Sequence, residues 1–284
     1  MQPELLRNIV PVILCGGGGQ RLRPLSTSAR PKAFLRLGSK FSMLQNTLLR
    51  VRDCADPVLL VNQSNRMILD HDLAEIGMNP RRIILEPGRR NTAPAIAAAA
   101  MMLRRDAVMM ILPCDHKIGN PYLLLKAALR AVPMAADGAI VSLGVTPRYA
   151  ETGYGYIRRG EAVNDNIYRV DRFVEKPVRS IAKMMIRSGT CDWNSGIVIA
   201  QAGTLLDEIQ TLEPGLYNGV KKSIVAGEQK GKHFYLSPEF LSVPSMSIDV
   251  AVLERSRNVL VQHTELDWQD LGSWRRLAQS VISG

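Results

Sequence analysis

Short apolar runs rich in β-branched residues alternate with helical patterns along the whole chain. This alternation is typical of a largely parallel sheet with helices on both faces, because parallel neighbours need a crossover that packs on the sheet. Pro11 lacks the backbone donor that a central strand needs, so we place it at the first residue of its strand. The runs that we expect to be strands are 9–14, 58–61, 83–85, 108–112, 139–145, 173–174, 197–200 and 258–262.

The clearest helix signal follows Asn91 and Thr92, which are suited to capping, and has Pro94 in its first turn. An apolar, alanine-rich stretch over 95–103 then predicts a buried helix. Around residues 154–176 the pattern is that of antiparallel strands, which indicates a smaller substrate-binding lobe. Three further helices are expected over residues 122–132, 180–188 and 273–282, the last with Trp274, Leu277 and Val281 on one face.

Composition excludes several classes of protein. The chain has 284 residues, 46% of them hydrophobic, which is enough for a sizeable core in one large domain or two small ones. No apolar run approaches the ~20 residues of a membrane span and the N-terminus has no signal pattern, so we expect a cytoplasmic protein without membrane contact. The four cysteines have no CxxC spacing, which predicts neither a zinc site nor disulfides.

The net charge of +10 indicates an anionic partner. The basic residues occur in scattered pairs, and aromatic residues make up only 5% of the chain. Few aromatic side chains are therefore present to stack on bases, which argues against a nucleic-acid partner. Small phosphorylated ligands suit the charge equally well.

A four-glycine loop over residues 16–19 follows the first expected strand, and Arg21 and Lys32 come shortly after it. Glycines allow backbone N–H groups to wrap a polyphosphate, to which the two basic side chains would add charge. The loop is neither a Walker A motif nor a dinucleotide fingerprint, and its alternative is an ordinary surface turn.

Other candidate groups also lie where strands end, which is where ligands bind in open α/β sheets. Glu86 could accept from the N1–H and N2–H₂ donors of guanine, although the residues alone favour an ordinary exposed acid. Asp115, and Asp270 in a loop before the last helix, could hold Mg²⁺, while Glu175 and Lys176 could take sugar hydroxyls and a second phosphate. Each of these could instead be a cap or a surface ion pair.

Taken together, these motifs resemble the sugar-1-phosphate nucleotidyltransferases, and within that family the guanylyltransferases that act on mannose 1-phosphate. The resemblance runs from about residue 9 to the C-terminus and rests on GGGGQRLRPL, PK, LEPGRRNTAPA, PCDH, TGYGYI, FVEKP, WNSGIVI, SIDVAVLE and WQDLGSW. It implies a Rossmann-like α/β fold, with a mostly parallel mixed sheet and a small antiparallel sugar-binding lobe. It also implies Mg²⁺-dependent transfer of GMP from GTP to mannose 1-phosphate, giving GDP-mannose and pyrophosphate.

The resemblance also implies roles for individual residues. The residues that would hold the GTP phosphates are Gly16, Gly17, Gly19, Arg21 and Lys32, and those at guanine are Glu86, Asn91 and Thr92. Asp115 and Asp270 would hold the magnesium. The sugar phosphate would be surrounded by Tyr154, Gly155, Glu175, Asn194 and Lys176, with Lys176 on its phosphate and Asp249 near the same pocket. The residues expected to be catalytic are Arg21, Lys32, Asp115, Lys176 and Asp270.

Two positions depart from the family pattern, which has Trp where Arg23 stands and Gln where Ala33 stands. We expect one nucleotidyltransferase domain over residues 1–284, with a substrate lobe roughly at 146–200 and 233–272. We expect no C-terminal β-helix or isomerase domain, which leaves a homo-oligomer as an open possibility. Two alternatives remain open: another sugar 1-phosphate, such as that of a heptose or another hexose, or a regulator that binds nucleotide sugars without turnover.

Overall fold

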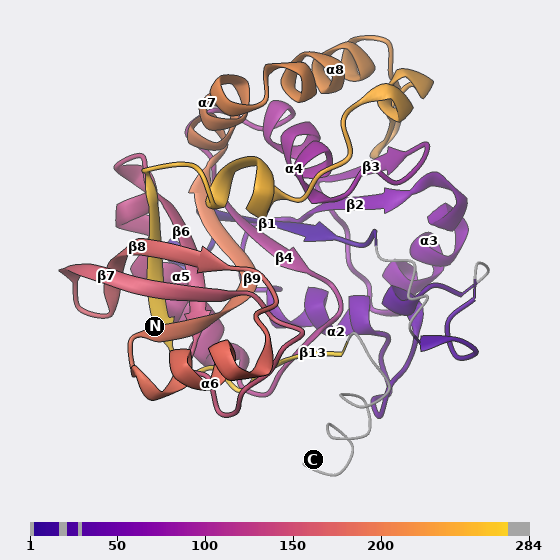
Figure 1. Ribbon diagram of the computed structural model, residues 1–284. Helices are drawn as coiled ribbons and strands as arrows, with labels where there is room; N and C mark the ends of the chain where they lie inside the picture. Colours follow the sequence, from indigo (N-terminus) through magenta and orange to yellow (C-terminus); the bar gives the residue numbers. More distant parts are fainter. Residues whose placement is uncertain (1–2, 17–21, 28–29, 272–284) are drawn as a thin grey trace.

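The structure, a computed structural model, describes residues 3–16, 22–27 and 30–271. Within these residues, eleven strands form one mixed sheet in the order β10-β11-β3-β2-β1-β4-β9-β6-β12-β8-β7 (Figure 1). Their bounds in that order are Glu228–Lys230, His233–Tyr235, Arg82–Glu86, Val58–Asn62, Ile9–Leu14, Val108–Pro113, Cys191–Gln201, Ile140–Val145, Val259–Thr264, Ile167–Val174 and Tyr156–Asn164. Strands β5 (His116–Ile118) and β13 (Trp268–Asp270) form a separate antiparallel pair.

Helices cover both faces of the sheet, as the alternating pattern predicted. Side chains of β1 alternate between two cores: Ile9 and Ile13 pack in one core, while Val10 and Val12 pack in the other. The first core includes α2 and α5, and the second includes α4, α7 and α8. The helices are α1 Pro3–Leu6, α2 Met43–Arg50, α3 Arg66–Glu75, α4 Thr92–Met101, α5 Pro121–Ala136, α6 Arg179–Arg187, α7 Ala202–Leu212 and α8 Pro214–Val225.

Pro11 corrects one prediction, because it is the third residue of the central strand β1 and not the first. The carbonyl of Ile9 accepts from Ala55 and the N–H of Cys15 donates to Leu60, so odd-numbered residues of β1 direct their backbone groups toward β2. The ladder with β2 begins only at Val12. The missing donor of Pro11 therefore lies on the β2 side just before that ladder starts, where it interrupts no hydrogen bond of the ladder.

The buried helix predicted after Asn91 is confirmed as α4. The Asn91 side chain accepts from the N–H of Thr92 at 2.9 Å, and residues 93–100 are all buried. The predicted helix over 122–132 lies within α5 and that over 180–188 coincides with α6, whereas 273–282 lies outside the described residues. Among the helices that the structure describes, none combines the length and the apolar character that crossing a membrane requires.

The antiparallel strands predicted around residues 154–176 are confirmed as the hairpin β7–β8. The hairpin extends the main sheet, because β8 pairs with β12 and β7 also pairs with β9. Hence the ends of β7, β8 and β9 lie next to one another at one side of the sheet. The segments just before β7 and just after β8 therefore lie beside the beginning of β9, which is antiparallel to β4 and starts on the side where β4 ends.

A capping box at the start of α2 also ties that helix to α3. The Ser42 hydroxyl accepts from the N–H of Gln45, while the Gln45 side chain accepts from the N–H of Ser42. The same hydroxyl donates to buried Asp72 at 2.5 Å. One serine therefore satisfies a helix terminus and a buried carboxylate together.

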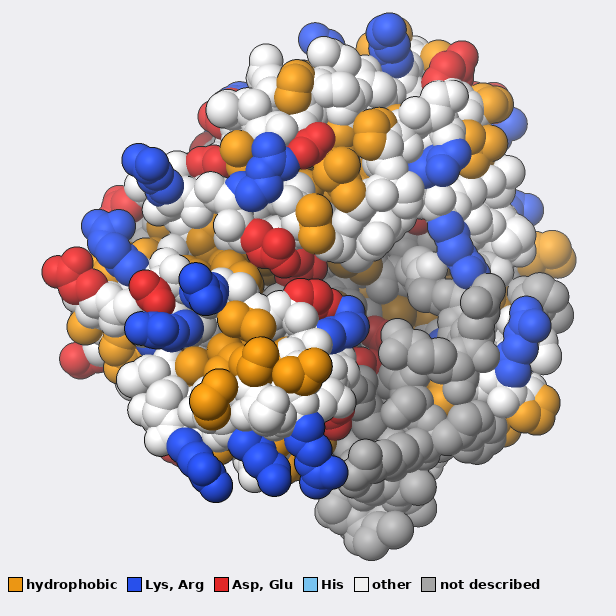
Figure 2. Space-filling view, in the orientation of Figure 1, with side chains coloured by type: hydrophobic (Ala, Val, Ile, Leu, Met, Phe, Trp, Pro, Cys, Tyr) orange, Lys and Arg blue, Asp and Glu red, His pale blue; other side chains and the backbone are white. Residues whose placement is uncertain are grey.

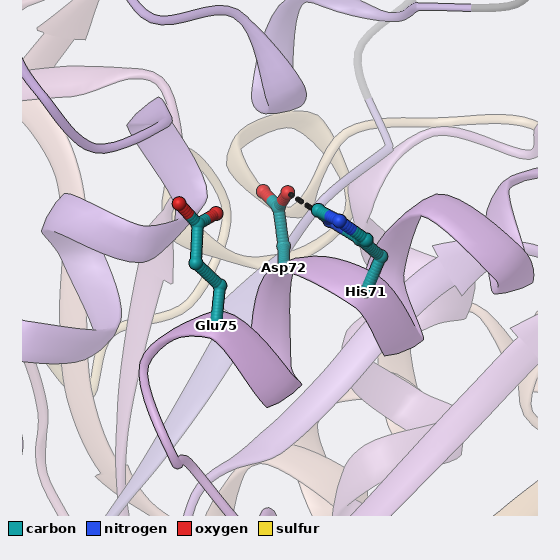
Figure 3. A group of neighbouring side chains, drawn as sticks. All are labelled: His71, Asp72 and Glu75. Carbon is teal, nitrogen blue, oxygen red and sulfur yellow. Dashed lines mark ion pairs between the residues drawn. The ribbon is translucent and has the colours of Figure 1, made fainter.

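Three side chains of α3, namely His71, Asp72 and Glu75, lie together in Figure 3. Their carboxylates already accept from protein donors: Asp72 from Ser42, and Glu75 from Arg36 at 2.5 Å. The His71 ring is 73% exposed and lies 3.9 Å from Asp72. We interpret the group as a structural network that joins α2 to α3.

Replacing Ser42 with alanine should lower the free energy of unfolding by about 2 kcal/mol, since it removes the cap and leaves Asp72 without its donor. Urea denaturation of both proteins measures this difference. Ser180→Ala, at an exposed position of α6, is the matched control and should change stability by less than about 0.5 kcal/mol. Equal losses from the two variants would show that the capping box has no special role.

Candidate active site

A buried lysine joins two aspartates that are far apart in the sequence. Lys32 begins the 3₁₀ turn η2 (Lys32–Phe34) and is 4% exposed. Its Nζ lies 2.5 Å from Asp115 Oδ2 and 3.5 Å from Asp270 Oδ1. Asp115 follows β4, and Asp270 is brought beside it because β13 pairs with β5. The structure thus brings together three of the residues predicted to be catalytic.

The charge of Lys32 determines the protonation of Asp115. Burial by itself would raise the pKa of Asp115, but the charge of nearby Lys32 and the hydrogen bond from it lower that pKa, so that it lies below its usual value. The carboxylate is therefore ionised at neutral pH. An ionised oxygen donor is what binding of a divalent cation requires.

Aromatic side chains position the two aspartates. Trp268 Nε1 donates to His116 Nδ1 at 3.1 Å, which leaves the ring proton on Nε2, 3.9 Å from Asp115. Burial lowers the pKa of His116, so the ring is neutral. The Tyr154 hydroxyl accepts from the backbone N–H of Asp270 at 3.3 Å, and its ring packs on Trp268. Tyr154, predicted to lie at the sugar, thus also positions a predicted metal ligand.

A cavity of about 260 Å³ lies beside this cluster. Glu86, the last residue of β3, lines it and is 5% exposed, so the interpretation of Glu86 as an ordinary exposed acid was wrong. The reason lies in the tertiary structure: β3 is an inner strand between β11 and β2, and residues 89–92, which follow it, line the same cavity. The residues around the cavity are Leu14, Gly16, Lys32, Ala33, Leu60, Glu86, Arg89, Arg90, Asn91, Thr92, Ala95, Pro113, Cys114 and Asp115.

Burial raises the pKa of Glu86 from its ordinary value of 4.5 to about 7. Glu86 forms no ion pair with any described residue, so no nearby cation offsets the loss of water. A carboxylate in this state gains free energy from a ligand that supplies N–H donors. The base-binding role predicted for Glu86 needs such a group.

Four of the predicted sugar residues form a second cluster. Asn194 on β9 donates from its side chain to Asp249 at 2.8 Å, and its backbone N–H donates to Gly155 at 2.8 Å. A Cβ added at Gly155 would lie 2.8 Å from a Glu175 oxygen, so the Glu175 side chain lies directly against this glycine. These four predicted sugar residues therefore lie around one point near the beginning of β9.

Acidic side chains are concentrated around the predicted sugar residues. Asp249 has a raised pKa, mainly because it is buried, and Glu175 acts on it in the same direction. Glu175 and Asp249 also contribute to a raised pKa at Glu254, after burial. Lys176, whose ammonium pairs with Glu175, supplies positive charge. Figure 2 shows acidic side chains gathered near the centre of this face, beside a hollow.

The Lys32 cluster and the cluster of predicted sugar residues lie next to each other at one end of the sheet. Gly196 on β9 lies against Pro113 and His116, where an added Cβ would be 3.6 and 3.9 Å away. On the other side, the Thr92 hydroxyl accepts from the N–H of Ile248, beside Asp249, at 2.8 Å. The base cavity, the Lys32 cluster and the sugar residues are thus neighbours. Of the predicted phosphate-binding residues, Gly16 and Lys32 line the cavity, while Gly17, Gly19 and Arg21 lie outside the described residues.

Sequence reasoning missed four side chains of this region. Three are aromatic side chains that pack together beside the aspartates, with both His116 and Trp193 against Trp268. The fourth is Arg90, which lines the cavity. The tryptophans sit next to predicted residues in WNSG and WQDL, but nothing local shows that the rings meet. For Arg90 the available signal was its position directly before the capping residue Asn91.

Comparison with known proteins assigns the family. A family model described as nucleotidyl transferase matches residues 10–281. The chain therefore belongs to the nucleotidyl transferase family, and its mixed α/β fold with a large sheet is that of the solved relatives. The motif-based family prediction and the predicted fold class are both confirmed.

Individual relatives are closely similar over most of the chain. Mannose-1-phosphate guanylyltransferase RfbM of Salmonella typhimurium is 40% identical over 280 residues, covering 95% of this chain and 58% of that protein. Mannose-1-phosphate guanylyltransferase of Escherichia coli is 38% identical over 281 residues, covering 95% of this chain and 59% of that protein. The chain thus spans less than two thirds of the length of these relatives. A Thermus thermophilus crystal structure named mannose-1-phosphate geranyltransferase superposes with a TM-score of 0.85 at 30% identity, covering 98% of this chain and 80% of that one.

The buried Glu86 predicts how stability depends on pH. Because its folded pKa exceeds its unfolded pKa, the folded protein binds more protons between about pH 4.5 and 7, and raising the pH through that window lowers stability. Glu86→Gln removes this loss. Its stability relative to wild type should therefore rise by up to about 3 kcal/mol between pH 5 and pH 8 in the absence of ligand.

Urea unfolding of both proteins at the two pH values checks this expectation. Glu239→Gln, at an exposed glutamate, is the control and should show little change with pH relative to wild type. A Glu86→Gln advantage that is the same at pH 5 and pH 8 would contradict the raised pKa.

Proposed function

We propose that this chain transfers GMP from GTP to mannose 1-phosphate, releasing pyrophosphate and GDP-mannose. The observation that carries the proposal is that Lys32, Asp115 and Asp270 meet between a cavity with a buried carboxylate and the polar cluster around Asn194 on β9. The names of the similar proteins support the choice of substrates.

The base cavity supports guanine as the base. Guanine presents N1–H and N2–H₂ side by side, and Glu86 offers a buried acceptor without a cationic partner among the described residues. Asn91 and Thr92, at the start of α4, line the same cavity. The Gly16 backbone lies beside Glu86, since a Cβ at this glycine would be 3.9 Å from its oxygen. This space suits the nucleoside, and the phosphates would extend toward Lys32.

The donor set around Lys32 fits a magnesium ion. Asp115 and Asp270 both direct an oxygen to the same ammonium group, so they face a common point, and magnesium binds through one or two carboxylates plus substrate phosphates. Asp115 and Asp270 would hold the ion. When bound, it would supply positive charge to the reacting phosphates.

The protein's own residues bring together two anions that repel each other. A phosphate oxygen of the sugar 1-phosphate attacks the α-phosphorus of GTP in line, the bond from that phosphorus to the β-phosphate oxygen breaks, and pyrophosphate leaves. No covalent intermediate with the enzyme forms. Lys32 would donate to phosphate oxygens, Lys176 would orient the attacking phosphate, and Arg21 would act on the leaving group.

Asn194, Asp249 and Glu175 would bind sugar hydroxyls. They present an amide and two carboxylates around one point, which matches several hydroxyl donors and acceptors. Burial is the main cause of the raised pKa of Asp249, and a sugar hydroxyl that donates to this carboxylate would offset part of the lost hydration. These groups suit a sugar and leave its stereochemistry open, so heptose and other hexose 1-phosphates remain alternatives to mannose 1-phosphate.

Asp115→Asn and Asp270→Asn should each lower pyrophosphate release with GTP, mannose 1-phosphate and magnesium by about 100-fold or more, by analogy with loss of one transition-state contact. The fold should be kept, as circular dichroism would verify. Asp267→Asn is the matched control, because Asp267 is exposed and pairs with Arg148 outside the cluster. Wild-type turnover by either of the two variants would refute the metal assignment.

Lys176→Gln should raise the KM for the sugar phosphate about tenfold or more and leave the KM for GTP nearly unchanged, because in the proposed reaction Lys176 contacts the attacking phosphate and not GTP. Steady-state kinetics with each substrate varied in turn test this split. Lys183→Gln on α6 is the control for loss of an exposed lysine. Repeating the assay with other hexose and heptose 1-phosphates ranks the sugars, and absence of turnover with all of them would favour a binding regulator.

A further inference from the structure

The base cavity contains two groups of opposite charge that do not pair with each other. Glu86 is buried and enters none of the ion pairs between described residues. Arg90 lines the same cavity, and its Nε is buried without a hydrogen-bond partner in the described part of the chain. Buried donors are rarely left unsatisfied in proteins, so the Arg90 Nε needs an acceptor that the described residues do not supply, and Glu86 has no described cation to offset its burial.

The backbone next to Arg90 is held in a strained conformation. Asn91 has φ 65° and ψ −166°, a region that residues other than glycine rarely adopt. It persists because the next turn is braced: Thr92 accepts from Ile248, and the N–H of Ala93 donates to Met246 at 3.1 Å. Strain of this kind is concentrated at ligand sites, which supports a binding role for this loop.

Guanine has one edge that suits Glu86 and another that suits Arg90. Its N1–H and N2–H₂ groups are donors that suit a carboxylate, and its O6 and N7 atoms are acceptors that an arginine commonly binds with two hydrogen bonds. We propose that Arg90 donates to O6 and N7 of the guanine base while Glu86 accepts from N1–H and N2–H₂. This inference rests on the proposed function and adds the residue that reads the second edge of the base.

Other occupants leave one of the two groups unsatisfied. Adenine presents an amino group where guanine has O6, so it would direct a donor at a donor. A phosphate would satisfy Arg90 but would bring a second negative charge close to Glu86. A ligand with donors on one edge and acceptors on the next satisfies both.

The first experiment compares binding of GTP, 7-deaza-GTP and ITP to the wild-type protein by calorimetry. 7-Deaza-GTP lacks the N7 acceptor and ITP lacks the N2 amino group. Each analogue keeps the other group of the same edge, so each should bind more weakly than GTP by about 10- to 150-fold, as expected for loss of one hydrogen bond to a charged group. Equal affinity of the wild type for GTP and 7-deaza-GTP would overturn the inference without any variant.

The second experiment assigns each edge to its residue. Arg90→Gln should bind GTP more weakly and lose the preference for GTP over 7-deaza-GTP, while keeping the preference for GTP over ITP. Glu86→Gln should show the reverse pattern. Arg81→Gln, at an exposed arginine just before β3, should leave both ratios unchanged.

The two proposals fail in different ways. If Arg90→Gln weakens GTP and 7-deaza-GTP by the same factor, Arg90 binds phosphate and the inference is wrong, while the proposed function stands. If the wild type prefers another nucleoside triphosphate to GTP, the proposed function fails and this inference fails with it.

Discussion

The site depends on one buried ammonium group held between two carboxylates. Without the charge of Lys32, the carboxylates of Asp115 and Asp270 would repel each other. A buried charge is costly unless it is paired, so Lys32 also needs the two aspartates. This mutual requirement holds three distant segments of the chain at one end of the sheet. It also leaves one oxygen of each carboxylate facing the same point.

Charges without partners mark the other parts of the site. Glu86 loses its water and gains no cation from the described residues, and the Arg90 Nε has no acceptor there. Both cost stability in the ligand-free protein. The two large apolar cores on either side of β1 offset that cost, because burial of apolar surface is the main favourable contribution to folding. The same groups gain most when a ligand satisfies them.

Local patterns predicted much of the fold. The strand ends and α4 follow from apolar period, glycine and proline positions and the Asn91 cap, all of which act within a few residues. The prediction for Pro11 was wrong because register with β2, and not position in the strand, decides whether a missing donor matters. The pair β5–β13 was missed because strands of three residues carry too little pattern to show alternation.

The sequence by itself determined which chemical groups the chain carries and that they follow strand ends, since a strand's carboxyl end can be read from local pattern. It also indicated the family through motifs spread along the chain. Only the tertiary structure decided that Glu86 is buried, that Lys32 lies between Asp115 and Asp270, and that Arg90 shares a cavity with Glu86. Burial and charge interactions depend on distances between residues far apart in sequence, and folding alone sets those distances.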